Sequence, residues 1–256
     1  MVLAIMQARM SSSRFPRKVL KPILGKPMIV HEWERLKRCA CIQSIILATS
    51  EDASDDDLAE ICQSYGVKVF RGCLDDVLTR YYQCALMESP DHVVRITGDC
   101  PVLDHYVVDK VIRQHVDEGN DYTVTTNNFP DGLDTEVLKF TALKKAAEEA
   151  MLPSEREHVT PYIRNHPDIF QIGYTEADVN WSTERWTVDE PRDFSFIEKI
   201  YESLYSAKPD FDMYDVLELL RKRPELRELN QGIGRNEGFL KSLQADEEYR
   251  KGKFNG

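Results

Sequence analysis

The part of the sequence that most constrains the fold is its start, where a short apolar run is followed directly by a basic loop. Residues 2–6 are uniformly apolar, which is typical of a central parallel strand buried on both faces of a sheet. Residues 7–18 then form a polar, serine-rich loop that leaves the carboxyl end of this strand. Open α/β sheets bind their ligands in the crevice outside these strand ends. The opening residues therefore predict an α/β protein with a ligand site at its first loop.

The charge of this loop is opposite to that of the whole protein. The chain has a formal net charge of -11, yet its first 31 residues contain no Asp or Glu and carry the cations Arg9, Arg14, Arg17, Lys18, Lys21 and Lys26. A basic segment on an acidic protein is most often a solvated surface. Its position directly after a buried strand favours phosphate binding instead. Because the loop has no glycine that would let backbone amides wrap a phosphate, side chains must supply many of the contacts.

Size and composition limit the class of protein. With 256 residues, 42% of them hydrophobic, the chain can bury one substantial core, and we expect one α/β domain with an appendage. The sequence shows neither a signal peptide nor an apolar stretch long enough for a membrane span, which predicts a cytoplasmic protein with no membrane partner. The six cysteines form no Cys-x-x-Cys pair and are expected to be reduced. The acidity of the chain argues against a nucleic acid partner.

Predicted strands and helices alternate along the chain. Strands are predicted at residues 2–6, 42–48, 67–70, 92–97, 121–126, 169–174 and 185–189, and helices at 28–38, 58–65, 77–87, 105–118, 141–150, 193–205 and 211–224. This order is typical of helices packed on both faces of a mostly parallel sheet. No internal repeat or low-complexity segment is present.

Two aspartates stand at predicted strand ends. Asp99 follows the strand at 92–97, between a glycine and a Cys-Pro pair. This arrangement can present a metal ligand, but an Asx-type turn explains the same residues. Asp189 ends the predicted strand at 185–189, shortly before a proline that begins a helix. If both carboxylates face one point, a shared cation is needed to offset their repulsion.

These motifs resemble those of a known family. Residues 5–20 read Ile-Met-Gln-Ala-Arg-Met-x-Ser-x-Arg-x-Pro-x-Lys-x-Leu, which is similar to the amino-terminal signature of the cytidylyltransferases that activate acidic sugars. The resemblance is closest to the spore-coat polysaccharide biosynthesis protein F type, a group similar to acylneuraminate and 3-deoxy-manno-octulosonate cytidylyltransferases. Thr-Gly-Asp at 97–99, Gly-Leu-Asp-x-Glu-Val at 132–137 and Thr-Val-Asp-x-Pro-x-Asp at 187–193 also match. The resemblance covers nearly the whole chain.

The resemblance implies a Rossmann-like three-layer αβα nucleotidyltransferase fold with a mostly parallel central sheet and a small appended dimerisation element. It implies a domain at 1–232, a substrate-binding and dimerisation insertion at about 128–182, a tail at 233–256, and a homodimer. The implied activity is transfer of CMP from CTP to an acidic sugar, with release of pyrophosphate, for coat or surface polysaccharide synthesis. Such a displacement requires positioned reactants and neutralised phosphate charge, without a covalent nucleophile.

The resemblance also implies roles for individual residues. Those implied to bind the nucleotide are Gln7, Ala8, Arg9, Ser13, Arg14, Lys18, Arg71 and Gly98, with Arg71 assigned to cytosine. Arg9 and Lys18 are further implied to act in catalysis, together with Asp99 and Asp189, which would hold Mg²⁺. The candidates for binding the sugar are Asp134, Glu136 and His158, with Arg164 as a further candidate for its carboxylate.

Several of these positions have alternative explanations. Asp134 and Glu136 could instead cap the helix at 141–150, and Asp193, which could bind the metal through water, could cap its own helix. The triple Asp at 55–57 invites a metal site, but its place before a helix favours capping.

Two features have no assigned role. Arg17 stands where the family usually has glycine, so it could change the shape of the loop or add a charged contact. The motif at 233–238 matches the carboxyl end of the family, and we predict no mechanism for it.

Two other functions are compatible with parts of the sequence. A nucleotide-sugar glycosyltransferase could use a similar sheet, but it would normally present an Asp-x-Asp ligand, and residues 97–100 offer one carboxylate. A noncatalytic binding module is disfavoured because the basic loop and both strand-end aspartates are present.

Overall fold

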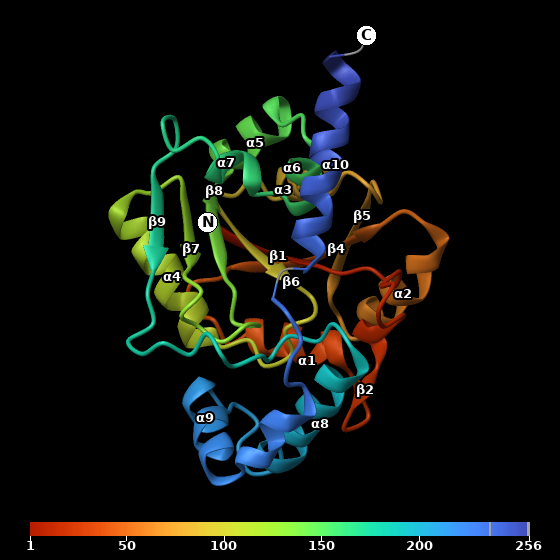
Figure 1. The fold of residues 1–256 in the computed structure, drawn as a ribbon, viewed down its shortest axis with the longest axis vertical. Coiled ribbons are helices and arrows are strands. Elements are labelled where there is room, and N and C mark those ends of the chain that lie inside the picture. Colours follow the sequence, from red (N-terminus) through yellow and green to blue (C-terminus); the bar gives the residue numbers. More distant parts are fainter. Residues whose placement is uncertain (236, 255–256) are drawn as a thin grey trace.

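The centre of the protein is a seven-stranded sheet, in a computed structural model that describes residues 1–235 and 237–254 (Figure 1). The strand order is β5-β4-β1-β6-β8-β7-β9. The strands are β1 (Val2–Gln7), β4 (Ser44–Ser50), β5 (Lys68–Gly72), β6 (His92–Thr97), β7 (Tyr122–Thr125), β8 (Glu136–Lys139) and β9 (Ile172–Thr175). β8 is antiparallel to both of its neighbours, and all the other pairs in the sheet are parallel. The predicted mostly parallel sheet is confirmed.

Helices cover both faces of the sheet, which makes three layers. They are α1 (Met28–Leu36), α2 (Asp56–Ser64), α3 (Val77–Leu86), α4 (His105–Glu118), α5 (Phe140–Glu149), α6 (Pro153–His158), α7 (Pro161–Arg164), α8 (Pro191–Leu204), α9 (Met213–Lys222) and α10 (Glu237–Phe254). Figure 1 shows α3, α5, α6 and α7 above the sheet and α1, α8 and α9 below it. The three-layer fold is therefore confirmed. No pattern in the sequence predicted α6, α7, α10 or the small hairpin of β2 (Pro22–Ile23) and β3 (Lys26–Pro27).

The apolar residues of β1 are divided between two cores. Val2, Ala4 and Met6 belong to the core on one face of the sheet, and Leu3 and Ile5 belong to the core on the other face. All five are buried, so β1 is the central strand expected from its apolar sequence. Full burial of one such large aliphatic side chain contributes about 1.5–3 kcal/mol. The first loop is consequently fixed at the middle of the sheet edge.

Several predicted strands differ from the structure. The strand predicted at 169–174 begins three residues later, at Ile172–Thr175. The strand predicted at 42–48 lies at Ser44–Ser50, because buried Asp55 accepts hydrogen bonds from its polar last two residues. The strand predicted at 185–189 is wrong. Arg185 makes one isolated bridge with Asp131, and the chain then crosses the end of β6, where Val188 N donates to Asp99 O (2.8 Å). A segment that crosses strand ends cannot continue a ladder.

The predicted division of the chain stays a prediction. The segment at 128–182 contributes β8 and β9 to the central sheet, so it is not separate from the main fold. The tail predicted at 233–256 contains α10, and Asn236 of its motif lies outside the described residues, as do residues 255–256. In the ranges that the structure describes, no helix is long and apolar enough to cross a membrane.

Candidate active site

The basic loop is tied to β4 by a buried carboxylate. Asp55 accepts a hydrogen bond from Met10 N in the loop (2.7 Å). It also accepts from Thr49 Oγ1 (3.0 Å) and from Ser50 N (3.1 Å) in β4. Asp55 makes no side-chain bond to the start of α2, because the loop and β4 use its oxygens. The prediction that the triple Asp caps this helix is therefore wrong for Asp55, which fixes the loop instead.

Arg17 has the left-handed backbone that explains the glycine usual at this position. Its φ is 61° and its ψ is 18°. For a residue with a Cβ this conformation costs roughly 1–2 kcal/mol, a penalty that glycine avoids. The Arg17 guanidinium pairs with Asp57 (2.8 Å), and both side chains are more than half exposed. Arg17 lines neither of the cavities described below.

Lys18 joins the two strand-end carboxylates. Its Nζ donates to Asp99 Oδ2 (2.9 Å), to Asp189 Oδ1 (3.0 Å) and to Val188 O (2.6 Å). The Lys18 side chain is 10% exposed, and each carboxylate is 24% exposed. Burial alone lowers the pKa of Lys18, but the charges of Asp99 and Asp189 outweigh it and raise this pKa. The two carboxylates do face one point, and the cation they share in this structure is the Lys18 ammonium.

Gly98 lets the turn that carries Asp99 pack against the end of β1. A Cβ at Gly98 would lie 2.5 Å from Ile29 Cδ1 and 3.0 Å from both Ala8 Cβ and Gln7 O. Gly98 N donates to Gln7 O (2.7 Å). A side chain at position 98 would therefore push Asp99 away from the loop.

The second carboxylate is held by two arginines. Asp189 Oδ1 pairs with Arg14 Nη2 (3.0 Å), and Asp189 Oδ2 pairs with Arg185 Nη2 (3.2 Å). Burial raises the pKa of Asp189, but the charge of Lys18, followed by that of Arg14, outweighs burial and lowers it. Asp193 pairs with Arg185 Nε (2.9 Å) and accepts from backbone N–H groups at the start of α8. The capping role considered for Asp193 is therefore confirmed.

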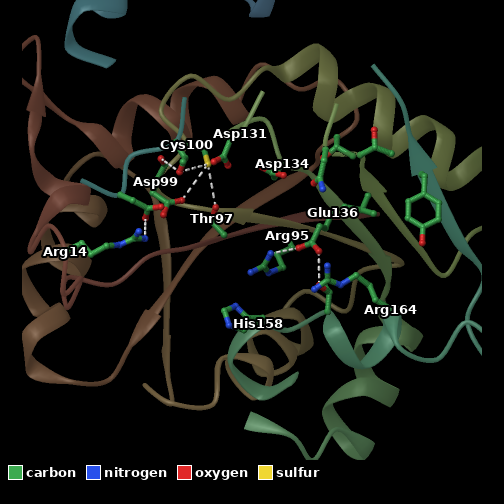
Figure 2. Close-up of a pocket in the computed structure, with 18 residues that line it drawn as sticks. Arg14, Arg95, Thr97, Asp99, Cys100, Asp131, Asp134, Glu136, His158 and Arg164 are labelled. Atoms are coloured by element: carbon green, nitrogen blue, oxygen red, sulfur yellow. Dashed lines mark hydrogen bonds and ion pairs between the residues drawn. The ribbon is translucent and has the colours of Figure 1, made fainter. Parts of the chain in front are cut away.

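Two cavities lie on either side of these charges. The loop cavity, of about 560 Å³, is lined by the predicted nucleotide-binding residues Gln7, Ala8, Arg9, Ser13, Arg14, Lys18 and Gly98. The sheet cavity, of about 690 Å³, is shown in Figure 2 and is lined by the predicted sugar-binding residues Asp134, Glu136, His158 and Arg164. Both cavities share Arg14, Thr97, Asp99 and Asp189. The structure thus brings together the loop, the strand-end aspartates and the sugar candidates.

A buried ion pair forms one wall of the sheet cavity. Arg95 and Glu136 are register partners on β6 and β8, and their side chains form a salt bridge. Glu136 also accepts from Tyr122 Oη and from Thr160 Oγ1 (2.8 Å). Burial raises the pKa of Glu136, but the Arg95 guanidinium outweighs burial and lowers it. Neither Asp134 nor Glu136 caps α5, which has no side-chain cap, so that alternative is wrong.

Arg71 is the one predicted nucleotide-binding residue that lines neither cavity. Its Nε donates to Ser50 O (2.8 Å) and its Nη2 to Asp52 O (2.9 Å). Its Nη1 pairs with Asp56 (2.7 Å). Because these contacts join the end of β5 to the loop after β4, they account for Arg71 structurally. Its role in cytosine recognition stays a prediction.

Arg95, Asp131 and Thr160 line the sheet cavity but were not among the sequence candidates. Arg95 stands between Val94 and Ile96 inside an apolar strand, and a charge at such a position is the signal that could have indicated it. Asp131 reads as part of a turn, and Thr160 belongs to no pattern. Both enter the site through contacts between distant segments, so the local sequence carries no signal for them.

The two strand-end carboxylates fit a divalent ion of the magnesium type. Among the described residues there is no group of three or more His, Cys, Asp or Glu side chains suited to a metal. Mg²⁺, however, commonly uses one or two carboxylates together with phosphate oxygens and water. Asp99 Oδ1 is approached by the weak donor Cys100 Sγ at 3.6 Å. Asp99 and Asp189 together therefore offer hard oxygen ligands at one point, beside the loop cavity.

Comparison with known proteins identifies the family. Residues 3–223 match the model of the family described as cytidylyltransferase. The chain is 36% identical over 236 residues to an uncharacterised protein of Methanocaldococcus jannaschii, covering 91% of this chain and 95% of the relative. It is 32% identical to the spore coat polysaccharide biosynthesis protein SpsF of Bacillus subtilis, covering 88% and 95%. A cytidylyltransferase structure from Leptospira borgpetersenii matches with a TM-score of 0.85 and 28% identity, covering 91% and 99%.

The chain therefore belongs to the cytidylyltransferase family and is a nucleotidyltransferase. It is also 34% identical to the mitochondrial 3-deoxy-manno-octulosonate cytidylyltransferase of Arabidopsis thaliana, over 54% of this chain and 49% of the relative. The structure of CMP:2-keto-3-deoxy-manno-octonic acid synthetase complexed with CTP shares the fold, with a TM-score of 0.63 and 16% identity over 79% and 98%. The predicted family is thus confirmed, and the roles of individual residues stay predictions.

Proposed function

We propose that the protein transfers CMP from CTP to a hydroxyl of an acidic sugar and releases pyrophosphate, as a step in coat or surface polysaccharide synthesis. Membership of the cytidylyltransferase family and the similarity to SpsF and to octulosonate cytidylyltransferases support this activity. The observation that carries it is the meeting of the loop cavity and the sheet cavity at Arg14, Asp99 and Asp189. Two reactants, one in each cavity, would have their reacting atoms at this boundary.

The loop cavity is proposed to hold CTP. In the reaction the sugar oxygen forms a bond to the α-phosphorus, and the bond to pyrophosphate breaks with its electron pair on the leaving group. Arg9 and Arg14, which line the loop cavity, would stabilise the charge that develops on the pyrophosphate. Lys18 adds a third cation at the boundary of the two cavities.

Asp99 and Asp189 are proposed to hold Mg²⁺, in keeping with their two carboxylates at one point. When bound, the ion would neutralise phosphate charge and lower the pKa of the attacking hydroxyl. Arg14 and Arg185 keep Asp189 in place through its two oxygens.

The sheet cavity is proposed to hold the acidic sugar. Arg95 Nε is buried and has no hydrogen-bond partner among the described residues, so a ligand oxygen could satisfy it. Figure 2 shows Arg95, His158 and Arg164 on one side of this cavity and Asp99 on the other. A carboxylate held by the cationic side would leave the rest of the sugar extending toward the boundary with the loop cavity.

We further propose a homodimer in the cytoplasm. The six cysteines are all free, which suits a reducing compartment. β9 is an edge strand with an exposed Tyr174, a surface suited to a second copy of the chain. Light scattering during size-exclusion chromatography would measure the mass, and a monomer at micromolar concentration would contradict the dimer.

Product analysis tests the proposed reaction. The purified protein is incubated with CTP, Mg²⁺ and a panel of neuraminate-like, pseudaminate-like and octulosonate acids, and mass spectrometry detects CMP-sugar while a coupled assay detects pyrophosphate. We expect both products with at least one acid, and CTP should raise the melting temperature more than UDP-sugars do. Glycosyl transfer from a UDP-sugar, with no CMP-sugar formed, would contradict the proposal.

A further inference from the structure

A segment with no predicted role crosses the site after the part of the chain that matches the family model. This segment, which we call the C-terminal strap, consists of residues 230–235 and 237–246, whereas the family match ends at residue 223. Figure 1 shows it in blue, passing in front of the sheet on its way to α10. At its start Asn230 Nδ2 donates to Arg185 O (2.9 Å). At its end Asp246 accepts from Ser154 N (2.8 Å) and Ser154 Oγ (2.6 Å) in α6.

Arg235 attaches the strap to the sheet cavity. Its Nη2 pairs with Asp134 Oδ1 (2.6 Å), and its Nε lies 3.6 Å from Asp131 Oδ1. Its Nη1 donates to Asn127 O (3.3 Å). All three partners line the sheet cavity. Asp134 is 45% exposed, so this pairing lies at the rim of the cavity.

The sheet cavity needs cations from outside its own lining. Among its described lining residues there are five carboxylates and three arginines, so the lining by itself is negative. Burial lowers the pKa of His158, which keeps this residue from adding charge near neutral pH. The carboxylates receive three further cations that do not line the cavity: Lys18, Arg185 and Arg235. An anionic ligand would be repelled without them.

Arg235 differs from the other two supporting cations. Lys18 and Arg185 have side chains that are 10% and 9% exposed, and both also contact Asp189 at the reaction centre. Arg235 has a side chain that is 20% exposed, and it pairs instead with Asp131 and Asp134. We propose that Arg235 is a positioning residue for the acceptor, which neutralises the acidic rim so that an anionic sugar can bind. This inference rests on the proposed function.

Kinetics of full-length variants test this role. R235Q should raise the KM for the sugar acid roughly tenfold, which corresponds to about 1.4 kcal/mol, because it leaves a charge uncompensated at a partly exposed rim. The KM for CTP and kcat should stay close to wild type. R235K keeps the charge and should stay within roughly threefold of wild type. About 0.5 M salt should narrow the difference between R235Q and wild type through screening. The matched control is R221Q, because Arg221 is an exposed arginine on α9 that pairs with Glu218. This variant should leave kcat and both KM values unchanged.

A double-mutant cycle separates charge from structure. In a D134N background, R235Q should raise the acceptor KM by a smaller factor than in wild type, because the charge it uncovers is gone. An unchanged acceptor KM in R235Q, or an equal factor in both backgrounds, would overturn the inference. If R235Q does not fold, as judged by its melting temperature, R235M is measured in the same cycle. If the wild type is active and R235Q keeps its acceptor KM, only this inference fails, whereas a wild type that transfers CMP to no acid removes the proposed function as well.

Discussion

Two clusters of paired charges lie in this site, and they differ in how the fold holds them. In the boundary cluster of Lys18, Asp99 and Asp189, the partners come from three separate segments. Both carboxylates are 24% exposed, and the Lys18 side chain is 10% exposed. In the wall cluster, Arg95 and Glu136 come from adjacent strands in register, and their side chains are 16% and 10% exposed.

The difference in burial predicts a difference in function. Charges that solvent can reach are able to exchange partners when a charged ligand arrives. For a buried pair the same exchange has a high free-energy cost, because removing one partner leaves the other charge desolvated. We therefore expect substitutions of the boundary carboxylates to change mainly activity, and substitutions in the wall cluster to lower stability in addition to any effect on sugar binding.

The largest effect is expected for Glu136→Ala in the wall cluster. It leaves the Arg95 guanidinium buried without its partner, and the free energy of unfolding should fall by about 3–5 kcal/mol. Urea denaturation followed by circular dichroism measures this loss. The double variant Arg95→Met with Glu136→Leu removes both charges and should lose less than Glu136→Ala does. If the free energy of unfolding falls by less than about 1 kcal/mol in Glu136→Ala, the predicted difference between the two clusters is wrong.

The next effect is on turnover. Asp99→Asn and Asp189→Asn should each reduce kcat roughly 10²–10³-fold, because each removes charge at the reaction centre, while the free energy of unfolding changes little. The double variant should be hardly slower than either single variant, since both are proposed to act through one ion. Asp57→Asn, in an exposed pair with Arg17, is the control. Additive losses would show that the two carboxylates act independently.

Lys18→Ala tests the cation of the boundary cluster. CTP binding should weaken by roughly 1.5–3 kcal/mol, as for a charge-assisted hydrogen bond. Because Lys18 is buried between two carboxylates, the melting temperature of the variant is measured alongside. Calorimetry measures the affinity. Lys21→Ala removes a charge from the same basic segment without touching either cavity and should leave CTP binding unchanged. Unchanged affinity in Lys18→Ala would exclude Lys18 from the nucleotide site.

A smaller effect, on the choice of nucleotide, is expected for Arg71→Ala. Arg71 lies outside both clusters. If Arg71 reads cytosine, the preference for CTP over UTP should narrow by roughly tenfold or less, since its guanidinium also has structural contacts. Competition binding with the two nucleotides measures the preference. An intact preference would mean that other groups read the base.

The smallest effect is expected for Arg17→Gly. Relief of the left-handed backbone favours the folded state, while the greater freedom of glycine favours the unfolded state, so stability should change by no more than about 1 kcal/mol. Chemical denaturation checks the size. A loss of several kcal/mol would mean that the surface pair with Asp57 matters more than its exposure suggests.

Two members of the boundary cluster, Lys18 and Asp99, could be predicted from the sequence because they follow strands with clear patterns. The apolar run of β1 allowed the position of the loop that contains Lys18 to be predicted. Gly98 allowed the turn that carries Asp99 to be predicted. Asp189 was found for a partly wrong reason, since its segment crosses strand ends and is not a strand. What the sequence could not indicate is that Lys18 itself joins the two carboxylates, because a local pattern does not describe a contact across 171 positions.

The wall cluster was only partly predictable. Glu136 was a candidate through its motif, but its partner Arg95 was not, although the two face each other in register. Strand pairing of β6 with β8 is a long-range choice, and β8 is the strand that reverses the direction of the sheet. The role of Arg235 depends in the same way on a segment that returns to the site after residue 223.

The strap also sets an order of assembly during translation. The ribosome makes the chain in the order of its sequence, so the sheet, both charge clusters and α6 precede the strap in synthesis. A nascent chain that has emerged through α9 therefore contains Asp131 and Asp134 but not yet their partner Arg235. The sheet cavity therefore gains its final charge balance only after the strap has left the ribosomal exit tunnel.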